Sequence, residues 1–214
     1  MNKSIAIQSS EVSRETLDII HALILEHETK INCYAERLKW WNARINLLSR
    51  NVGLDEIHQH IRHSLYLHTY LKFEKNVVDA GSGGGLPGIP IAMADENKSV
   101  TLVDIVGKKM LACESMAIQC GLKNVRTVKQ SIGDYEPVPD SVLVSKHAFK
   151  IPELLKMIEG KSYSKIIMLK GDDYREELKT CGTDLHVDVH TIDAIEPAPF
   201  FKGKCIVTIK LNSA

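Results

Sequence analysis

Apolar positions in the first 75 residues recur at intervals of three, four or seven, which is the spacing of one helix face. The series is Leu17, Ile20, Ile24, Ile31, Tyr34, Leu38, Trp41, Ile45 and Leu48, and it continues through Ile57, Ile61, Leu65 and Leu71. Asp55 stands where an N-cap residue would begin the later helix. The pattern predicts an all-helical region over residues 1–75.

After residue 75 the pattern changes to short β-branched runs that alternate with helical stretches. The runs lie at residues 77–78, 100–103, 125–128, 142–144, 166–169, 186–190 and 206–209. Helices are expected between the first five runs, whereas the last two lack a convincing helix between them. The chain is therefore predicted to be an α/β protein. We expect a seven-stranded, mostly parallel doubly wound sheet over residues 76–214 that ends in a hairpin. The helical region 1–75 is expected to pack on this sheet.

Length and charge narrow the class of protein. The chain has 214 residues, which suits one domain with an extension, and 27 basic residues balance 27 acidic ones. No apolar run approaches the roughly 20 residues of a membrane helix. The opening residues MNKSIAIQSSE lack the apolar centre of a secretory signal, so we expect a cytoplasmic protein without a membrane span. The zero net charge at first argues against a nucleic-acid partner.

Cysteines and histidines do not form a metal-binding pattern. The five cysteines contain no C-x-x-C pair, and Cys113 and Cys120 share one helix face, so packing roles are expected. His60, His63 and His68 have no cysteine or carboxylate at a convincing ligand spacing. We therefore predict no metal site. Instead, His60 and Ser64, four residues apart, are expected to face a cofactor cleft.

A glycine-rich turn follows the first predicted strand, at residues 79–90 (DAGSGGGLPGIP). A turn that leads into a helix near Gly88 would present backbone N–H groups and the helix N-terminus to a ligand. The second strand ends in Asp104, whose carboxylate can accept both hydroxyls of a ribose or, alternatively, cap the next helix. Together these features predict a nucleotide-cofactor site.

Two cofactors compete for this turn. A dinucleotide G-x-G-x-x-G motif fits only from Gly83 to Gly88, with Pro87 inside the turn. Counting from the strand end instead gives Asp79-x-Gly81-x-Gly83-x-Gly85, the pattern of S-adenosylmethionine (SAM) methyltransferases. The terminal hairpin also favours this class over an oxidoreductase. SAM is therefore the expected cofactor.

Several motifs together resemble the bacterial small-subunit ribosomal RNA methyltransferase G family, also called glucose-inhibited division protein B. They are residues 79–90, 102–104 (LVD), 107–109 (GKK), 41–42 (WN), 46–47 (NL), His60 with 64–65 (SL), and 169–171 (LKG). The LPGIP tail of the turn is the most discriminating of them. The resemblance implies a Rossmann-like fold and transfer of a methyl group from SAM to N7 of a guanine in 16S rRNA, free or within the small ribosomal subunit or an assembly intermediate.

The same resemblance implies particular site residues. The matched cofactor positions are Gly81, Gly83, Leu86, Asp104, Ile132, Gly133 and His147. Relatives usually carry an acidic residue where Gly133 stands, so a contact there would come through the backbone. Relatives carry an arginine after the fourth predicted strand, where this chain has Lys146 and His147. Alignment places His147 at the arginine, whereas Lys146 is chemically closer, and neither reproduces the bidentate guanidinium.

Guanine N7 methylation needs alignment rather than proton removal, because N7 carries a free lone pair and the sulfonium methyl has a good leaving group. Lys146 or His147 is expected to orient the base or the cofactor. Phosphate contacts are expected from Lys108, Lys109 and Lys170.

Local charge supports an RNA-binding face. Residues 98–129 contain six basic residues against two acidic ones. The zero net charge is thus a sum over regions and predicts weak affinity for arbitrary RNA.

Three matters stay open. An oxidoreductase that uses NAD, and an RNA-binding or ribosome-assembly factor that kept the fold but lost turnover, are the two alternatives. A monomer is expected. Trp40 and Trp41 do not decide whether the helical region binds RNA or only covers one face of the sheet.

Overall fold

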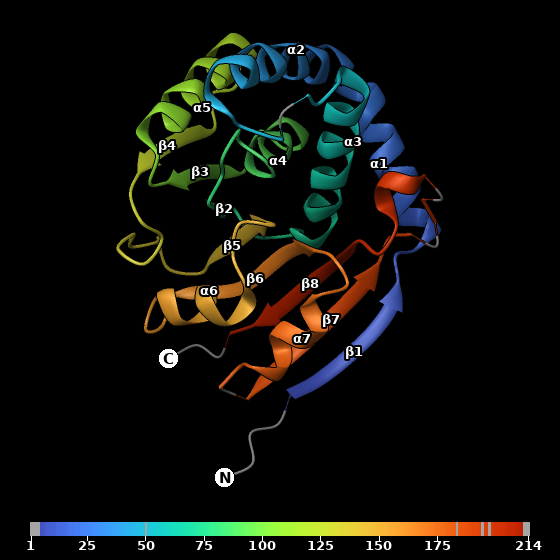
Figure 1. Cartoon of the computed structure of the whole chain (residues 1–214), viewed down its shortest axis with the longest axis vertical. Coiled ribbons are helices and arrows are strands. Elements are labelled where there is room, and N and C mark those ends of the chain that lie inside the picture. Colours follow the sequence, from blue (N-terminus) through green and yellow to red (C-terminus); the bar gives the residue numbers. More distant parts are fainter. Residues whose placement is uncertain (1–4, 50, 183, 194, 197, 212–214) are drawn as a thin grey trace.

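A computed structural model describes residues 5–49, 51–182, 184–193, 195–196 and 198–211. Within these ranges, eight strands form one sheet with helices on both faces (Figure 1). The strands are β1 (Ile5–Glu11), β2 (Asn76–Ala80), β3 (Ser99–Asp104), β4 (Val125–Lys129), β5 (Ser141–Lys146), β6 (Tyr163–Lys170), β7 (Leu185–Thr191) and β8 (Cys205–Lys210). The helices are α1 (Arg14–Glu26), α2 (Glu28–Ile45), α3 (Leu54–Leu65), α4 (Gly88–Ala94), α5 (Gly107–Gln119), α6 (Ile151–Met157) and α7 (Tyr174–Lys179), with 3₁₀ turns at Tyr66–Tyr70 and Pro199–Phe201.

All seven predicted strands are present, as β2 to β8, and the α/β class is confirmed. The strand order is β1-β7-β8-β6-β5-β2-β3-β4. The pairs β6–β8 and β7–β8 are antiparallel and the other pairs are parallel, so the expected terminal hairpin is present.

The prediction of an all-helical first region and a seven-stranded sheet was wrong, because β1 adds an eighth strand. It pairs in parallel with β7, from Ile5 opposite Leu185 to Glu11 opposite Thr191. Most of its side chains are exposed. The strand is therefore held mainly by its ladder to β7, whose residues lie 180 positions further along the chain, and no local pattern predicts such a partner.

Two further local predictions need correction. The β4–β5 connection is described throughout and carries no helix, because Gly133, Pro137 and Pro139 interrupt it. Helix α3 takes Gly53 as its N-cap, so Asp55 lies inside the first turn. There its carboxylate faces the positive end of the helix dipole without capping it.

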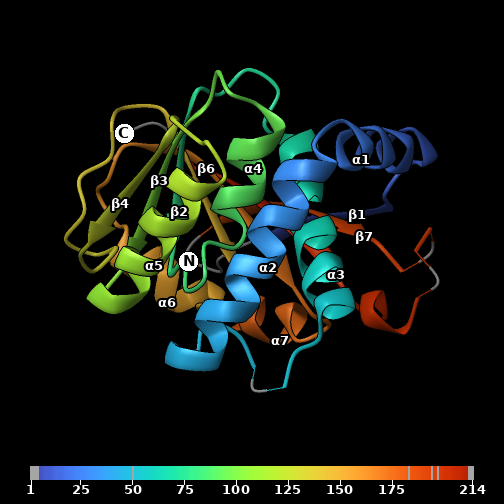
Figure 2. The same cartoon turned by 90° about the horizontal axis from the view of Figure 1, so that it is seen from above.

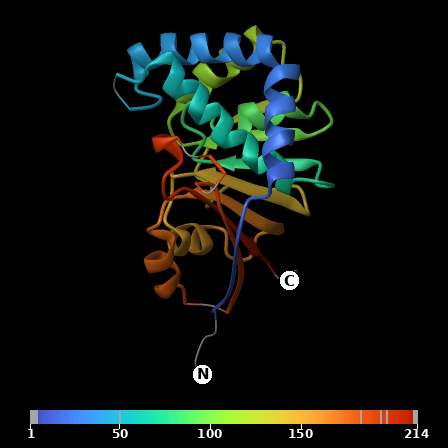
Figure 3. The ribbon, with the colours of Figure 1, turned by 90° about the vertical axis from the view of Figure 1, so that its right-hand side faces the viewer.

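The helices are divided between the two faces of the sheet. Helices α1 to α5 lie on one face and α6 and α7 on the other (Figures 1 and 3). Strand β2 shows why both faces are apolar, since Val77 packs into the core on the α1–α5 side and Val78 into the opposite core. Continuous apolar strands are thus buried on both sides.

The N-terminal helices share a core with the sheet and reach the glycine turn. Helix α2 packs against α5, and α3 packs against α4, as Figure 2 shows from above. The Tyr34 hydroxyl of α2 donates to the Gly84 carbonyl over 2.8 Å. The limits 1–75 and 76–214 stay a prediction, and their outermost residues 1–4 and 212–214 lie outside the described ranges.

The cysteines are free thiols and help to pack α5. Cys113 lies against the Gly83 carbonyl with a 3.4 Å contact, and the Cys120 sulfur lies 3.1 Å from that of Cys33 in α2. Cys113 of α5 thus points toward the glycine turn, and Cys120, the C-cap residue of α5, points toward α2. Among the described helices, none combines the length and apolar character required to cross a bilayer.

Candidate functional site

The glycine turn after β2 is tied to the end of β3 by its own backbone. Gly81 N and Ser82 N both donate to the Val103 carbonyl, over 2.9 and 3.2 Å. Gly81 has a φ of +67°, and a Cβ there would meet the Ala148 Cβ at 2.7 Å. Glycine is therefore needed for both the left-handed backbone and the close approach of the β5–α6 loop.

The expectation that the N–H groups of this turn face a ligand was wrong for several of them. Besides Gly81 and Ser82, Gly83 N donates to Asp104 Oδ2 over 3.0 Å. Gly88 N, at the start of α4, donates to Asp79 Oδ2 over 2.8 Å. The carboxylate of Asp79 thus occupies the helix N-terminus that the sequence offered to a ligand.

The two aspartates at the strand ends differ in their surroundings. Asp79 is fully buried, and burial raises its pKa from 3.8 to about 7, so the carboxyl titrates near neutrality. Asp104 accepts one N–H on each oxygen, from Gly83 and from Val106 over 2.9 Å. Each oxygen keeps a second lone pair, so Asp104 can tie down the turn and still accept ribose hydroxyls.

A cavity of about 530 Å³ opens beside the turn. Its walls include Gly81, Gly83, Leu86, Asp104 and Ile132, which are five of the seven expected cofactor residues. The structure brings these residues together from three strand ends, at the edge where ligands bind in doubly wound sheets. The volume suits a nucleotide-sized ligand.

The other two expected cofactor residues stand next to the wall. Gly133 follows Ile132, and its N–H is bonded to the Ser131 hydroxyl over 3.2 Å. His147 follows Lys146, takes a left-handed φ of 53°, and has an exposed side chain. A direct cofactor contact from either residue therefore stays a prediction.

Sequence reasoning missed part of the wall. Leu47 and Leu48 line the cavity from the α2–α3 loop, which the Asn42 side chain holds by accepting their N–H groups over 2.8 and 2.7 Å. Other overlooked wall residues include Ile105, Val106, Gln130, Ser131, Ala148, Phe149 and Met157. The shared WN and NL motifs were the signal for the α2–α3 loop, since Asn42 and Leu47 belong to them.

Lys146 lines the same cavity from the end of β5. Its Nζ lies 2.9 Å from Nδ1 of His60 in α3. Burial, and then the nearby Lys204 ammonium, lower the pKa of Lys146 to about 8. Burial, and then Lys146, lower the pKa of His60 to about 3, so this imidazole is neutral at physiological pH. His60 itself is not among the residues that line the cavity and approaches it through Lys146, so the expectation that His60 faces the cleft stays a prediction.

Ser64 and His63, which follow on α3, are fully buried. Ser64 donates its hydroxyl to the His60 carbonyl over 2.8 Å, so it supports the helix instead of facing the cleft as expected. His63 packs edge-on against Phe200 and Phe201. Among the described residues, no cluster of three histidine, cysteine or acidic side chains is arranged to hold a metal ion.

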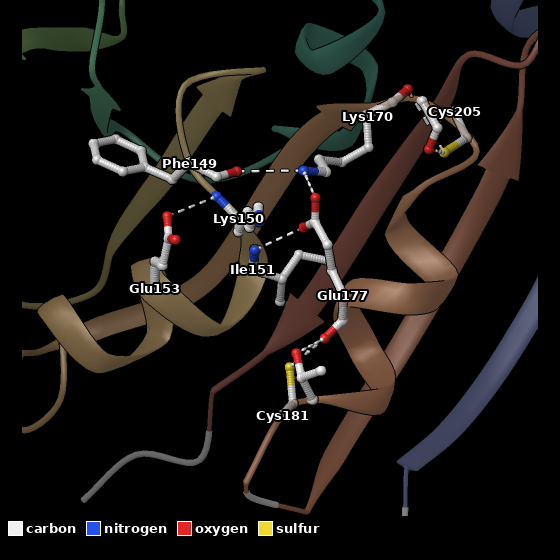
Figure 4. Close-up of polar contacts among 10 residues, drawn as sticks. Phe149, Lys150, Ile151, Glu153, Lys170, Glu177, Cys181 and Cys205 are labelled. Atoms are coloured by element: carbon white, nitrogen blue, oxygen red, sulfur yellow. Dashed lines mark hydrogen bonds and ion pairs between the residues drawn. The ribbon is translucent and has the colours of Figure 1, made fainter.

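The structure contradicts the phosphate role expected of Lys170. Its ammonium is buried, 2.6 Å from the Glu177 carboxylate of α7 and 3.3 Å from the Phe149 carbonyl (Figure 4). The second oxygen of Glu177 accepts Ile151 N, at the start of α6, over 2.8 Å. The pair therefore fastens the loop between Lys146 and α6, whereas the sequence alone predicted a phosphate contact from Lys170.

The other expected phosphate contacts lie in the first turn of α5. Lys108 is exposed, whereas Lys109 lines the cavity. Lys98 also belongs to the basic stretch, but it is buried beside Asp95 and bonded to the Glu74 carbonyl. The surface part of the basic stretch is thus smaller than the count over residues 98–129 suggested.

The fold and the position of the cavity are those of a Rossmann-like methyltransferase, and solved structures have the same fold. The chain is similar to a tRNA (uracil-54, C5)-methyltransferase of Pyrococcus abyssi in complex with S-adenosyl-L-homocysteine, with a TM-score of 0.55, 15% identity, and coverage of 72% of this chain and 38% of that one. It is also similar to a SAM-dependent methyltransferase from Aquifex aeolicus, with a TM-score of 0.51, 18% identity, and coverage of 70% and 89%. These likenesses establish the Rossmann-like methyltransferase fold.

The chain belongs to the rRNA small subunit methyltransferase G (GidB) family, whose model matches residues 27–199. Two relatives named "Ribosomal RNA small subunit methyltransferase G" support this. The one from Chlorobium chlorochromatii is 35% identical over 199 residues, covering 87% of this chain and 84% of the relative. The one from Chlorobium luteolum is 34% identical over 191 residues, covering 83% and 79%. The resemblance read from the sequence motifs is confirmed.

Proposed function

We propose that this chain transfers a methyl group from SAM to N7 of a guanine in 16S rRNA. The observation that carries the proposal is the cavity itself, where the glycine turn, Asp104 and the Lys146 ammonium line one space at the ends of β2, β3 and β5. Family membership supplies the rRNA substrate class, and the cavity supplies a place for the cofactor next to a hydrogen-bond donor.

The hydrogen bonds of the turn favour SAM over NAD. A pyrophosphate needs free backbone N–H groups, whereas those of Gly81, Ser82, Gly83 and Gly88 are already used within the protein. SAM has no pyrophosphate, so its binding does not require these N–H groups. Bound there, SAM would supply an electrophilic methyl group on a good leaving group.

The residues assigned to the cofactor have distinct proposed roles. Asp104 accepts the ribose hydroxyls, and Gly81, Gly83 and Leu86 leave room for the main part of the molecule. Ile132 lies against the adenine, with Gly133 beside it through the backbone alone.

The protein's part in the reaction is to align the base and exclude water. N7 attacks with a lone pair that is already free, so no general base is required. The Lys146 ammonium donates to guanine O6, which lies beside N7 on the Hoogsteen edge, and thereby fixes the direction of attack. The base must first leave its stack to reach the cavity. His147, next along the chain, is the second candidate for holding the base.

RNA contacts are assigned to the start of α5. Lys108 is exposed and free to reach a phosphate, and Lys109 extends the positive charge toward the cavity wall. The target is 16S rRNA, alone or in a small-subunit particle. The proposal also includes a cytoplasmic location and a monomeric state. Light scattering on the purified chain checks the monomeric state.

The test is methyl transfer by the purified chain. Labelled SAM is incubated with 16S rRNA, small-subunit particles and, as a control, 23S rRNA, and calorimetry compares SAM with NAD. SAM binding with label in 16S rRNA supports the proposal. NAD binding in place of SAM would establish the oxidoreductase alternative. SAM binding without transfer to either small-subunit substrate would favour the assembly factor that lost turnover.

A further inference from the structure

Two polar side chains of helix α3 form a chain of contacts that ends at Lys146. Glu56 and His60 stand four residues apart, on one face of the helix. His60 Nδ1 lies 2.9 Å from Lys146 Nζ, and His60 Nε2 lies 3.9 Å from the Glu56 carboxylate. The chain of contacts therefore runs from a half-exposed carboxylate, through a mostly buried imidazole, to the ammonium at the cavity wall.

The chemistry of the donors fixes the direction of these contacts. A lysine ammonium carries three donors and no acceptor, so Nδ1 of His60 must accept from Lys146. The imidazole proton then sits on Nε2, the nitrogen that faces the Glu56 carboxylate. The Phe200 ring packs on the imidazole in a T-shaped arrangement with centroids 4.9 Å apart, which limits the rotation of the imidazole. Orientation of one ring nitrogen by a partner on the other is a recurrent way to position a functional group.

We propose that His60 is a positioning residue for methyl transfer, which holds the Lys146 ammonium at the cavity wall through Nδ1 while Glu56 favours the required tautomer. The inference rests on the proposed function, since it explains how the donor to guanine O6 is aimed. It also gives the N-terminal helical region a part in the chemistry, because α3 and not the sheet supplies the acceptor.

The charged groups around Lys146 explain why an acceptor is needed there. Lys204, next to β8, lowers the pKa of Lys146, whereas Asp79 beneath the glycine turn raises it. His60 and His63 on α3 and His147 on the β5–α6 loop are further titratable side chains near Lys146. Without the contact to His60 Nδ1, the Lys146 ammonium would be buried near the Lys204 ammonium, and Asp79 would be the acidic group that offsets this repulsion. The pKa of Lys146 would then fall further, and its ammonium would no longer be held in one orientation.

The variants separate positioning from folding. His60→Leu removes the acceptor, and His60→Asn restores one near the place of Nδ1. His58→Leu is the matched control, because His58 lies on the same helix but bonds to Asn32 and to the Leu54 carbonyl, away from Lys146. Lys146→Arg keeps a charge that does not titrate in the working range.

The first measurement is the pH dependence of methyl transfer with saturating SAM. We expect His60→Leu to lower kcat about tenfold to hundredfold and to move the alkaline loss of activity to lower pH. SAM affinity should stay within about threefold of wild type, since the cofactor walls are intact. His60→Asn should recover most of kcat, and Glu56→Gln should lower it less than His60→Leu does. Lys146→Arg should lose the alkaline limb.

The second measurement does not depend on activity. NMR of the lysine Cε–H groups, with the Lys146 signal assigned by its loss in Lys146→Arg, gives the titration midpoint of Lys146 directly. We expect it to fall in His60→Leu and to stay unchanged in His58→Leu. Equal kcat, alkaline limb and Lys146 midpoint in the two leucine variants would overturn the positioning role. If the Lys146 midpoint falls in His60→Leu as expected but the wild-type chain methylates no rRNA, the proposed function is overturned instead.

Discussion

The buried ion pair between Lys170 and Glu177 offers a quantitative test of how the cavity is held. Their side chains are 5% and 8% exposed, and the carboxylate also accepts Ile151 N at the start of α6 (Figure 4). Lys170→Met would leave this carboxylate buried without its cation. Breaking a buried pair in this way costs about 3–5 kcal/mol of unfolding free energy.

The control is an exposed ion pair on α7, the helix that carries Glu177. Lys179 and Glu176 are also 2.6 Å apart, but their side chains are 68% and 76% exposed. Lys179→Met is therefore expected to cost at most about 1 kcal/mol. The measurement is urea unfolding monitored by circular dichroism. The urea concentration at the midpoint should be lower than in wild type by about 1 M or more for Lys170→Met, and by much less for Lys179→Met.

A double variant isolates the unpaired charge from the lost packing. Lys170→Met with Glu177→Gln leaves no buried charge, and the glutamine oxygen can still accept Ile151 N. It should recover at least about 2 kcal/mol relative to Lys170→Met alone. A Lys170→Met variant as stable as Lys179→Met, or a double variant less stable than Lys170→Met, would refute the structural role assigned to this pair.

Three further predictions concern the turn and its surroundings. Gly81→Ala should lose at least about tenfold in SAM affinity by calorimetry, because its Cβ would lie 2.7 Å from that of Ala148 in a left-handed backbone, and unchanged affinity would contradict the close approach. Asp79 has its pKa raised to about 7, so its contribution to stability is lost as pH rises from about 4 to about 7. The melting temperature of Asp79→Asn relative to wild type should therefore increase over that range, and a constant difference would count against the shifted carboxyl. Lys108→Ala should reduce the slope of log affinity for rRNA against log salt by about one unit while leaving SAM binding intact, and an unchanged slope would remove its phosphate contact.

Local sequence was enough to predict the centre of the site. The turn at residues 79–90 and Asp104 could be predicted because they depend on neighbouring residues. The backbone at Gly81 has a φ of +67°, which favours glycine, so the turn is visible in the sequence itself. Strands β2 to β8 were likewise visible as β-branched runs. The central strands β2, β3 and β5 read as continuous apolar segments because both of their faces are buried.

Long-range contacts account for what the sequence did not reveal. Strand β1 is mostly exposed and depends on β7, so its residues 5–11 carry no strong strand signal of their own. The burial of Lys170 depends on Glu177 and on the loop before α6, and a lysine in isolation is read as a surface charge. The contact of His60 with Lys146 joins residues 86 positions apart. Spacing on α3 predicted only that His60 faces the cleft.

The central claim is methylation of guanine N7 in 16S rRNA, and mapping that modification tests it most directly. Ribosomal RNA is isolated from cells with the chain, without it, and with the chain restored as wild type or as Lys146→Met. It is then cleaved chemically at N7-methylguanine. The account predicts one 16S signal that disappears without the chain and returns with wild type but not with Lys146→Met. A signal that persists in cells lacking the chain would contradict it.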